Sequence, residues 1–232
     1  MLTAVIFDVD GVLLASPHER AWREALDGIT EPSRFTTAMY QAYVAGKPRL
    51  AGATAALEAL GLPDAERLAK PYAERKQLRL EQLIEEGAFS AFPDALRLAD
   101  AILALKWKLA AASSSRNAND MMRAVHLPSG LNLLEAFTAN VCGRPVPHGK
   151  PAPDLFLLAA RELGRASSAC LVVEDAPAGV EAARAGGMAA IGVARLHDAQ
   201  LLQQAGADLV VTSLDQVDTD ELAGGRLCRR RS

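Results

Sequence analysis

Five short apolar runs constrain what this sequence can fold into more than any other feature. Each run is a few residues long, contains β-branched or small apolar side chains, and ends at polar or small residues. Short runs of this kind are typical of strands that are buried on both faces of a parallel sheet. The predicted strands are residues 4–7, 109–112, 171–173, 190–193 and 209–211.

Stretches with helical periodicity lie between these runs. They cover residues 94–106, 117–125, 154–163, 178–185 and 198–204. Alternation of strands and helices favours an α/β fold, in which a doubly wound, Rossmann-like parallel sheet is covered by helices on both faces. The chain of 232 residues is long enough to bury such a core.

The segment of residues 14–88 has a different character, because it contains no strand-like run. It reads as four helices that are separated by breaks containing proline or glycine. These predicted helices are residues 18–26, 33–44, 54–60 and 64–86. An all-helical block after the first strand indicates an inserted cap. We therefore predict a catalytic core of residues 1–13 and 89–232 and a helical cap of residues 14–88.

Composition excludes several classes of partner. The formal net charge is -3, so nothing suggests general binding of nucleic acid or membranes. No apolar run approaches the length of about 18 residues that a membrane-spanning helix needs. The three cysteines are scattered and have no zinc spacing. We expect a cytoplasmic monomer, and the basic run of residues 226–231 is interpreted as a frayed, solvated tail.

Polar residues gather where the predicted strands end. The chain has neither a GxGxxG motif after a strand nor a GxxxxGK[ST] motif, which disfavours a nucleotide-binding domain. In open α/β sheets the ligand lies beyond the carboxyl ends of the strands. Four places there carry reactive groups: Asp8 and Asp10, the run Ser113-Ser114-Ser115-Arg116-Asn117, Lys150 in Gly149-Lys150-Pro151, and the pair Glu174-Asp175. Each alone has an ordinary explanation, such as a turn or a helix cap. The occurrence of all four groups at the ends of strands of one sheet has no such ordinary explanation.

This set of groups suits phosphoryl transfer. Asp8 is the candidate nucleophile, because a carboxylate that attacks phosphorus forms an aspartyl phosphate. Such an attack brings two anions together and needs positive charge, which Mg²⁺ and Lys150 supply. Mg²⁺ prefers hard oxygen ligands. We expect Asp8, Glu174 and Asp175 to supply carboxylates to it, and we count Asp10 among the metal-binding residues as well.

Two further residues are assigned from the same chemistry. Ser113 is placed to donate a hydrogen bond to the transferring phosphoryl group. Asp10 stands two residues beyond Asp8 and is the candidate general acid and base toward the leaving or attacking oxygen. The candidate catalytic residues are therefore Asp8, Asp10, Ser113 and Lys150.

The motifs resemble those of the haloacid dehalogenase superfamily of phosphotransferases over nearly the whole chain. Phe7-Asp8-Val9-Asp10-Gly11-Val12 matches the first motif of that superfamily, and Ala112-Ser113 the second. Gly149-Lys150-Pro151 begins the third, and Val173-Glu174-Asp175 the fourth. The resemblance implies an aspartyl-phosphate enzyme that depends on Mg²⁺ and carries a helical cap.

Three cap segments carry a closer match: His18-Glu19-Arg20-Ala21-Trp22, Gly46-Lys47-Pro48-Arg49 and Glu74-Arg75-Lys76. They resemble the cap of the β-phosphoglucomutase subgroup within that superfamily. The resemblance implies that Arg49 grips the non-reacting phosphate of the substrate together with the loop Ser114-Ser115-Arg116-Asn117. It implies that Lys76 reaches the sugar side of the cleft and that His18 positions Asp10. One departure stands out, since the spacer between Asp10 and His18 is short and has Ala15-Ser16 where an acidic residue is usual.

The leading hypothesis is a sugar-phosphate mutase of β-phosphoglucomutase type, with a small-molecule phosphatase on the same core as the alternative. A dehalogenase or a phosphonate-cleaving enzyme fits less well, because Asp10 and the metal carboxylates serve phosphate chemistry. A catalytically silent binding module on this fold predicts the loss of at least one core group, and every core position is filled.

Overall fold

A six-stranded parallel sheet forms the centre of the computed structural model, which describes residues 1–230. The strand order is β5-β4-β1-β6-β7-β8. This confirms the predicted doubly wound α/β fold, because the chain leaves β1 toward β4 and β5 and then returns to build the other half. The strands are β1 (Ala4–Phe7), β4 (Lys108–Ala111), β5 (Ala139–Asn140), β6 (Cys170–Glu174), β7 (Ala189–Val193) and β8 (Leu209–Val211).

Helices cover both faces of this sheet. The side chains of a strand point alternately to its two faces, and β1 shows the consequence. Val5 and Phe7 belong to a cluster with the helices on one face, whereas Ala4 and Ile6 belong to the cluster on the other. The first face carries α5 (Pro93–Ala104), α6 (Ala118–Arg123) and α10 (Thr219–Ala223), and the second α7 (Asp154–Glu162), α8 (Pro177–Ala185) and α9 (Ala199–Gln204).

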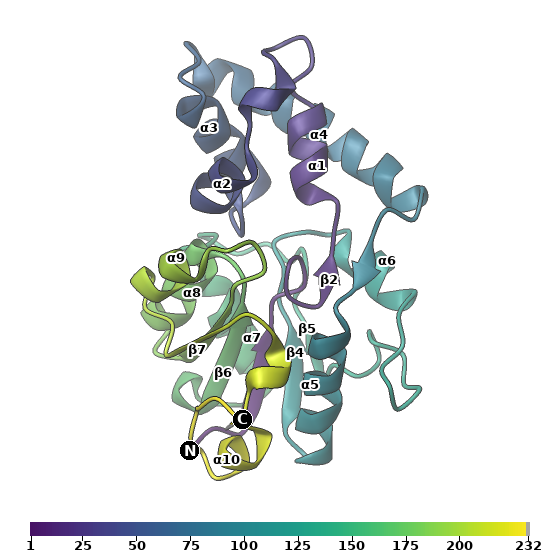
Figure 1. The fold of residues 1–232 in the computed structure, drawn as a ribbon, viewed down its shortest axis with the longest axis vertical. Helices are drawn as coiled ribbons and strands as arrows, with labels where there is room; N and C mark the ends of the chain where they lie inside the picture. The colour runs from purple at the N-terminus through teal and green to yellow at the C-terminus, as the bar shows by residue number, and fades with distance from the viewer. Residues whose placement is uncertain (231–232) are drawn as a thin grey trace.

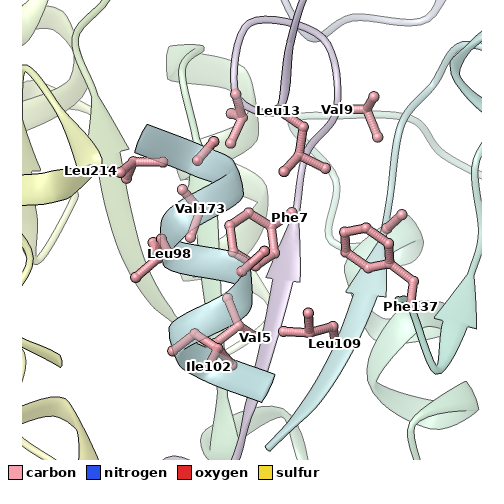
Figure 2. Close-up of a cluster of buried hydrophobic side chains, with 14 of the residues drawn as sticks. Val5, Phe7, Val9, Leu13, Leu98, Ile102, Leu109, Phe137, Val173 and Leu214 are labelled. Atoms are coloured by element: carbon pink, nitrogen blue, oxygen red, sulfur yellow. The ribbon is translucent and has the colours of Figure 1, made fainter. Parts of the chain in front are cut away.

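Figure 2 shows the first of these clusters. The ring of Phe7 lies between β1 and α5, where Leu98 and Ile102 pack toward the sheet. Phe137 meets Phe7 edge-on at a ring-centroid distance of 6.1 Å. Burial of each such side chain contributes about 1.5–3 kcal/mol. This dry packing fixes the carboxyl end of β1, from which Asp8 emerges.

A second lobe of helices stands beyond the carboxyl ends of the strands (Figure 1). We call its segment His18–Glu85 the cap segment. It contains α1 (His18–Glu24), a 3-10 turn (Pro32–Arg34), α2 (Thr37–Met39), a π turn (Tyr40–Val44), α3 (Arg49–Ala59) and α4 (Ala65–Glu85). Its own apolar cluster includes Trp22, Phe35 and Tyr72. The division at residues 13, 14, 88 and 89 stays a prediction.

Two very short strands join the lobes. β2 (Leu14–Ala15) and β3 (Ser90–Ala91) pair antiparallel, with Leu14 opposite Ala91. This corrects the expectation that residues 14–88 contain no strand. A two-residue strand is too short for its alternation to be visible in a sequence.

The helix predicted over residues 33–44 is also wrong. The chain forms a 3-10 turn, is extended at the buried Phe35, and starts again at Thr37. The Thr36 side chain accepts a hydrogen bond from the Met39 N–H at 3.2 Å, which is a helix N-cap. The predicted helix over 54–60 begins earlier, at Arg49.

The basic C-terminal run is held against the core as far as Arg230, so the expectation of a frayed tail is wrong for this part. The Arg230 N–H donates to the Gln216 carbonyl at 2.8 Å, and Val217 and Arg229 form a β-bridge. Arg226 pairs with Glu221 at 2.5 Å. The last arginine of the run, Arg231, lies outside the described residues. Among residues 1–230, no helix combines the length and the apolar character needed to cross a membrane.

Candidate active site

Asp8 is the first residue after β1, at the centre of the sheet. Its N–H donates to the Val173 carbonyl of β6 at 3.0 Å, so β1 and β6 together position it. The Lys150 ammonium donates to Asp8 Oδ1 at 2.6 Å and also to Glu174 Oε1. Asp8, Lys150 and Glu174 are all buried. The structure therefore brings the candidate nucleophile and the candidate lysine into direct contact.

Glu174 is held firmly at the end of β6. Its Oε2 accepts hydrogen bonds from the N–H groups of Asp175 and Ala176, each at 2.9 Å. Gly179 on α8 makes this placement possible, because a Cβ at that position would overlap the Glu174 carboxylate. A Cβ on Gly11 would likewise overlap the Asp175 carboxylate. Gly11 also has a φ of +87°, a conformation that residues other than glycine rarely adopt.

If all three carboxylates of this cluster were ionised, negative charge would exceed positive charge there. Burial raises the pKa of Asp8 to about 8, with Lys150 opposing the shift and Glu174 and Asp10 adding to it. Burial together with Glu174 and Asp8 raises the pKa of Asp175 well above its ordinary value. One lysine does not balance three carboxylates.

The surplus charge fits a divalent cation. Asp8, Glu174 and Asp175 each offer a carboxylate oxygen, and these oxygens lie within 4.8 Å of one another. Three buried carboxylates form the donor set that Mg²⁺ or a similar hard cation takes. The predicted ligand Asp10 is not brought into this group within the described residues, because its carboxylate is engaged elsewhere.

Asp10 lies between the core and the cap segment. Ser113 Oγ donates to Asp10 Oδ2 at 2.7 Å, and His18 Nε2 approaches Asp10 Oδ1 at 3.3 Å. His18 Nδ1 in turn lies 3.0 Å from Lys76 Nζ. The contact between Ser113 and Asp10 was not predicted from the sequence, which had assigned Ser113 to the phosphoryl group.

Burial determines the charge states of His18 and Lys76, the two basic residues next to Asp10. Burial and the neighbouring Lys76 lower the pKa of His18 to about 4, although Asp10 opposes the shift. Burial and Arg49 lower the pKa of Lys76 to about 7, again against Asp10. His18 is therefore neutral near pH 7, with one ring nitrogen able to donate to Asp10 and the other able to accept from Lys76.

A cavity of about 530 Å³ opens above Asp8, between the core and the cap segment. The structure brings the predicted substrate-binding residues together on its wall. They are His18, Arg49, Lys76, Ser114, Ser115, Arg116 and Asn117. Lys150 and Glu174 are not on this wall, because they lie beneath Asp8. We call this space the substrate cavity.

Several wall residues were missed at the level of sequence. They are Trp22, Tyr40, Val44, Ala45, Gly46, Lys47, Gln77 and Glu81. Gln77 and Glu81 had a detectable signal, since Gln77 follows Lys76 directly and Glu81 lies four residues beyond Gln77 on the same helix. Gln77 Nε2 reaches Asn117 Oδ1 at 3.5 Å, which links the cap segment to the core. Tyr40 had no such signal.

Comparison with known proteins gives one family and consistent relatives. Residues 2–187 match the family of haloacid dehalogenase-like hydrolases. A β-phosphoglucomutase of Mycobacterium bovis is 33% identical over 246 residues, covering 92% of this chain and 90% of that protein. A phosphorylated carbohydrates phosphatase of Thermotoga maritima is 31% identical over 217 residues, covering 90% and 94%. The solved archaeal β-phosphoglucomutase of Pyrococcus sp. strain ST 04 has a TM-score of 0.74 at 30% identity, covering 97% and 100%.

Proposed function

Because the chain belongs to the haloacid dehalogenase-like hydrolase family, we propose that it moves the phosphoryl group of a sugar phosphate through an aspartyl phosphate on Asp8. Its relatives confirm the resemblance to the β-phosphoglucomutase subgroup and to sugar-phosphate mutases and phosphatases as a group. The proposal goes further in naming Asp8, Mg²⁺ and the mutase reaction.

The observation that carries the mutase proposal is a cavity whose wall holds several cationic side chains in addition to the lysine that contacts the nucleophile. Asp8 lies on this wall and contacts Lys150, and the wall also includes Lys47, Arg49 and Arg116. Two places that accept phosphate suit a sugar bisphosphate, which must present each of its phosphates to Asp8 in turn. A phosphatase needs only the first place.

The residues of this chain have distinct tasks in the proposed reaction. The Asp8 carboxylate attacks phosphorus, and Lys150 offsets the charge of the attacking oxygen. Asp10 donates a proton to the leaving sugar oxygen and later takes one from the accepting hydroxyl. Mg²⁺ held by Asp8, Glu174 and Asp175 would offset the charge of the phosphoryl oxygens. The cap segment excludes water from the phosphorylated enzyme.

The phosphatase remains the second candidate, supported by the similarity to the phosphatase of Thermotoga maritima. The two reactions separate in one assay that contains β-glucose 1-phosphate, Mg²⁺ and a trace of glucose 1,6-bisphosphate. Formation of glucose 6-phosphate supports the mutase, and release of free phosphate alone rules it out for this sugar. An Asp8→Asn variant that kept full turnover in either reaction would remove Asp8 as the nucleophile.

A further inference from the structure

A second cavity lies beside the active site, on the side of the connection between the lobes. Its volume is about 170 Å³. Its walls are Gly11, Ala15, Ser16, Phe92, Arg195 and Leu196 of the core side and connection, Glu19 and Gln41 of the cap segment, and the three residues Asp10, Tyr40 and Asp175. We call it the back cavity.

The back cavity and the substrate cavity meet at these last three residues, since Asp10, Tyr40 and Asp175 line both. Asp10 and Asp175 belong to the core and carry the proposed acid-base and metal chemistry. Tyr40 belongs to the cap segment. Within the described residues, Tyr40 is therefore the part of the cap segment that stands between the two spaces.

The backbone at Tyr40 has an unusual form. Residues Tyr40–Val44 make a π turn, which the Ala45 N–H closes onto the Tyr40 carbonyl at 2.9 Å. Such turns are rare and occur frequently at functional sites. Here Tyr40 and Gln41 face the cavities, whereas Tyr43 of the same turn is 49% exposed.

The walls of the back cavity suit water. Ser16, Glu19 and Gln41 supply polar groups to it. The Gln41 amide oxygen is buried and has no hydrogen-bond partner in the described part of the protein. Burial, with Asp175 and Asp10 adding to it, raises the pKa of Tyr40 well above its ordinary value, so the phenol keeps its proton. A cavity with room for a water and two to four polar partners on its wall can hold that water.

We propose that Tyr40 is the barrier that limits access of water from the back cavity to phosphorylated Asp8, an inference that rests on the aspartyl phosphate proposed above. The step it restrains is hydrolysis. A water oxygen attacks phosphorus, the bond from phosphorus to the Asp8 oxygen breaks, and Asp8 keeps the electron pair as a carboxylate. Asp10 takes one proton from the water, and inorganic phosphate leaves. Tyr40 thus sets the balance between transfer and hydrolysis.

The test measures the lifetime of the phosphorylated enzyme when no sugar acceptor is present. The enzyme is loaded with labelled acetyl phosphate and Mg²⁺, and the label on the protein is followed by rapid quenching. We expect Tyr40→Ala to shorten the lifetime on the order of tenfold, which corresponds to about 1.4 kcal/mol. Tyr40→Phe keeps the ring volume and should stay within about twofold of the native lifetime.

Two further variants make the test independent of a general loss of structure. Tyr43→Ala removes an exposed ring from the same turn and should leave the lifetime unchanged. Gln41→Leu makes the back cavity less polar and should lengthen the lifetime, which an unfolded cap segment cannot do. The rate at which label enters the protein should be unchanged in Tyr43→Ala and Gln41→Leu, because neither residue lines the substrate cavity.

The outcomes separate this inference from the proposed function. If the native enzyme accumulates no labelled protein that depends on Asp8, the aspartyl phosphate is wrong and the inference falls with it. If labelled enzyme forms, but Tyr40→Ala and Gln41→Leu decay at the native rate, the barrier is wrong and the aspartyl phosphate stands. Opposite shifts in these two variants support the barrier.

Discussion

Close approach between atoms, more than charge alone, decides what single residues can do in this site. Glu174 accepts two backbone hydrogen bonds and contacts Lys150 while it lies under α8. That position is open only because residue 179 has no side chain. Glycine in a helix costs about 1 kcal/mol relative to alanine, so its presence at this position reflects the space that Glu174 needs.

Replacement of Gly179 tests that view. We expect Gly179→Ala to displace the Glu174 carboxylate and weaken binding of a divalent cation by about tenfold, in the range seen when groups around metal ligands are changed. Isothermal titration with Mg²⁺ and with Mn²⁺ measures the effect. Gly186→Ala at the end of the same helix is the control, because its nearest new neighbour lies at 3.3 Å. Unchanged affinity in Gly179→Ala would show that Glu174 does not hold the cation.

Lys76 gives a prediction on pH. In the unfolded chain its pKa is near 10.5, whereas in the protein burial lowers it to about 7. Between these values the unfolded state binds more protons at this residue, so the contribution of Lys76 to the free energy of unfolding falls as the pH drops from 10.5 to 7 and is level below 7. Lys76→Met abolishes this dependence. Urea unfolding from pH 6 to 10 of the native protein and of Lys76→Met gives the difference.

The same helix supplies a matched control for this measurement. Lys70 also lies on α4 but is exposed, so the free energy of unfolding of Lys70→Met should change with pH in the same way as that of the native protein. If the difference between the native protein and Lys76→Met did not change with pH, Lys76 would be charged in the folded state throughout. The wall of the substrate cavity at Lys76 would then carry a fixed positive charge.

At the scale of elements, one carboxylate connects α5 to the loops that follow β7 and β8. Asp94 at the start of α5 accepts from Arg195 Nη1 at 2.7 Å and Nη2 at 3.0 Å. It also accepts from the Leu214 N–H at 2.7 Å and from the Ser213 hydroxyl at 3.0 Å. Arg195 also stacks on Phe92, at 4.0 Å from the ring centroid, beside the back cavity. The far wall of that cavity therefore depends on Asp94.

Removal of this carboxylate should be costly. Asp94→Ala leaves the largely buried Arg195 guanidinium without its partner, and we expect a loss of about 3–5 kcal/mol in the free energy of unfolding. Asp215→Ala is the comparison, because its pair with Arg97 is half exposed and such pairs contribute about 0–1 kcal/mol. Chemical denaturation of both variants measures these two losses in the free energy of unfolding. Equal losses would mean that burial of the Asp94 pair adds nothing.

Elements also differ in how far a sequence predicts them. Asp8, Ser113, Lys150 and Glu174 were predictable as a group, because parallel strands end at one edge of a sheet and polar residues at that edge meet. Tyr40 was not, because residues 33–44 have the composition of a continuous helix and nothing local indicates a π turn. The contact of Ser113 with Asp10 depends on two strand ends at once, so it appears only when β1 and β4 are paired.

At the scale of the whole molecule, each of the two lobes places a glycine where they touch. Gly46 of the cap segment lies against Ala176 and Lys150, and its carbonyl is 3.4 Å from the Ser114 hydroxyl. Across the same contact Gly149 faces the ring of Pro48 so closely that a Cβ on residue 149 would overlap it. The position of the cap segment against the core therefore includes a close contact between Gly149 and Pro48.

Substitution at residue 149 should separate the lobes without touching a reactive group. The backbone of Gly149 is not in the left-handed region, so alanine is acceptable to the chain itself. The new Cβ must push Pro48 away, and a misplacement of about 1 Å can cost about hundredfold in kcat/KM. We expect a loss of that order in Gly149→Ala, together with a larger radius of gyration in small-angle scattering. The double variant Pro48→Ala/Gly149→Ala removes the ring atoms that the new Cβ meets. It should recover most of the lost kcat/KM and most of the native radius of gyration. If the double variant were as impaired as Gly149→Ala, the defect would lie in the neighbouring Lys150 and not in the meeting of the two lobes.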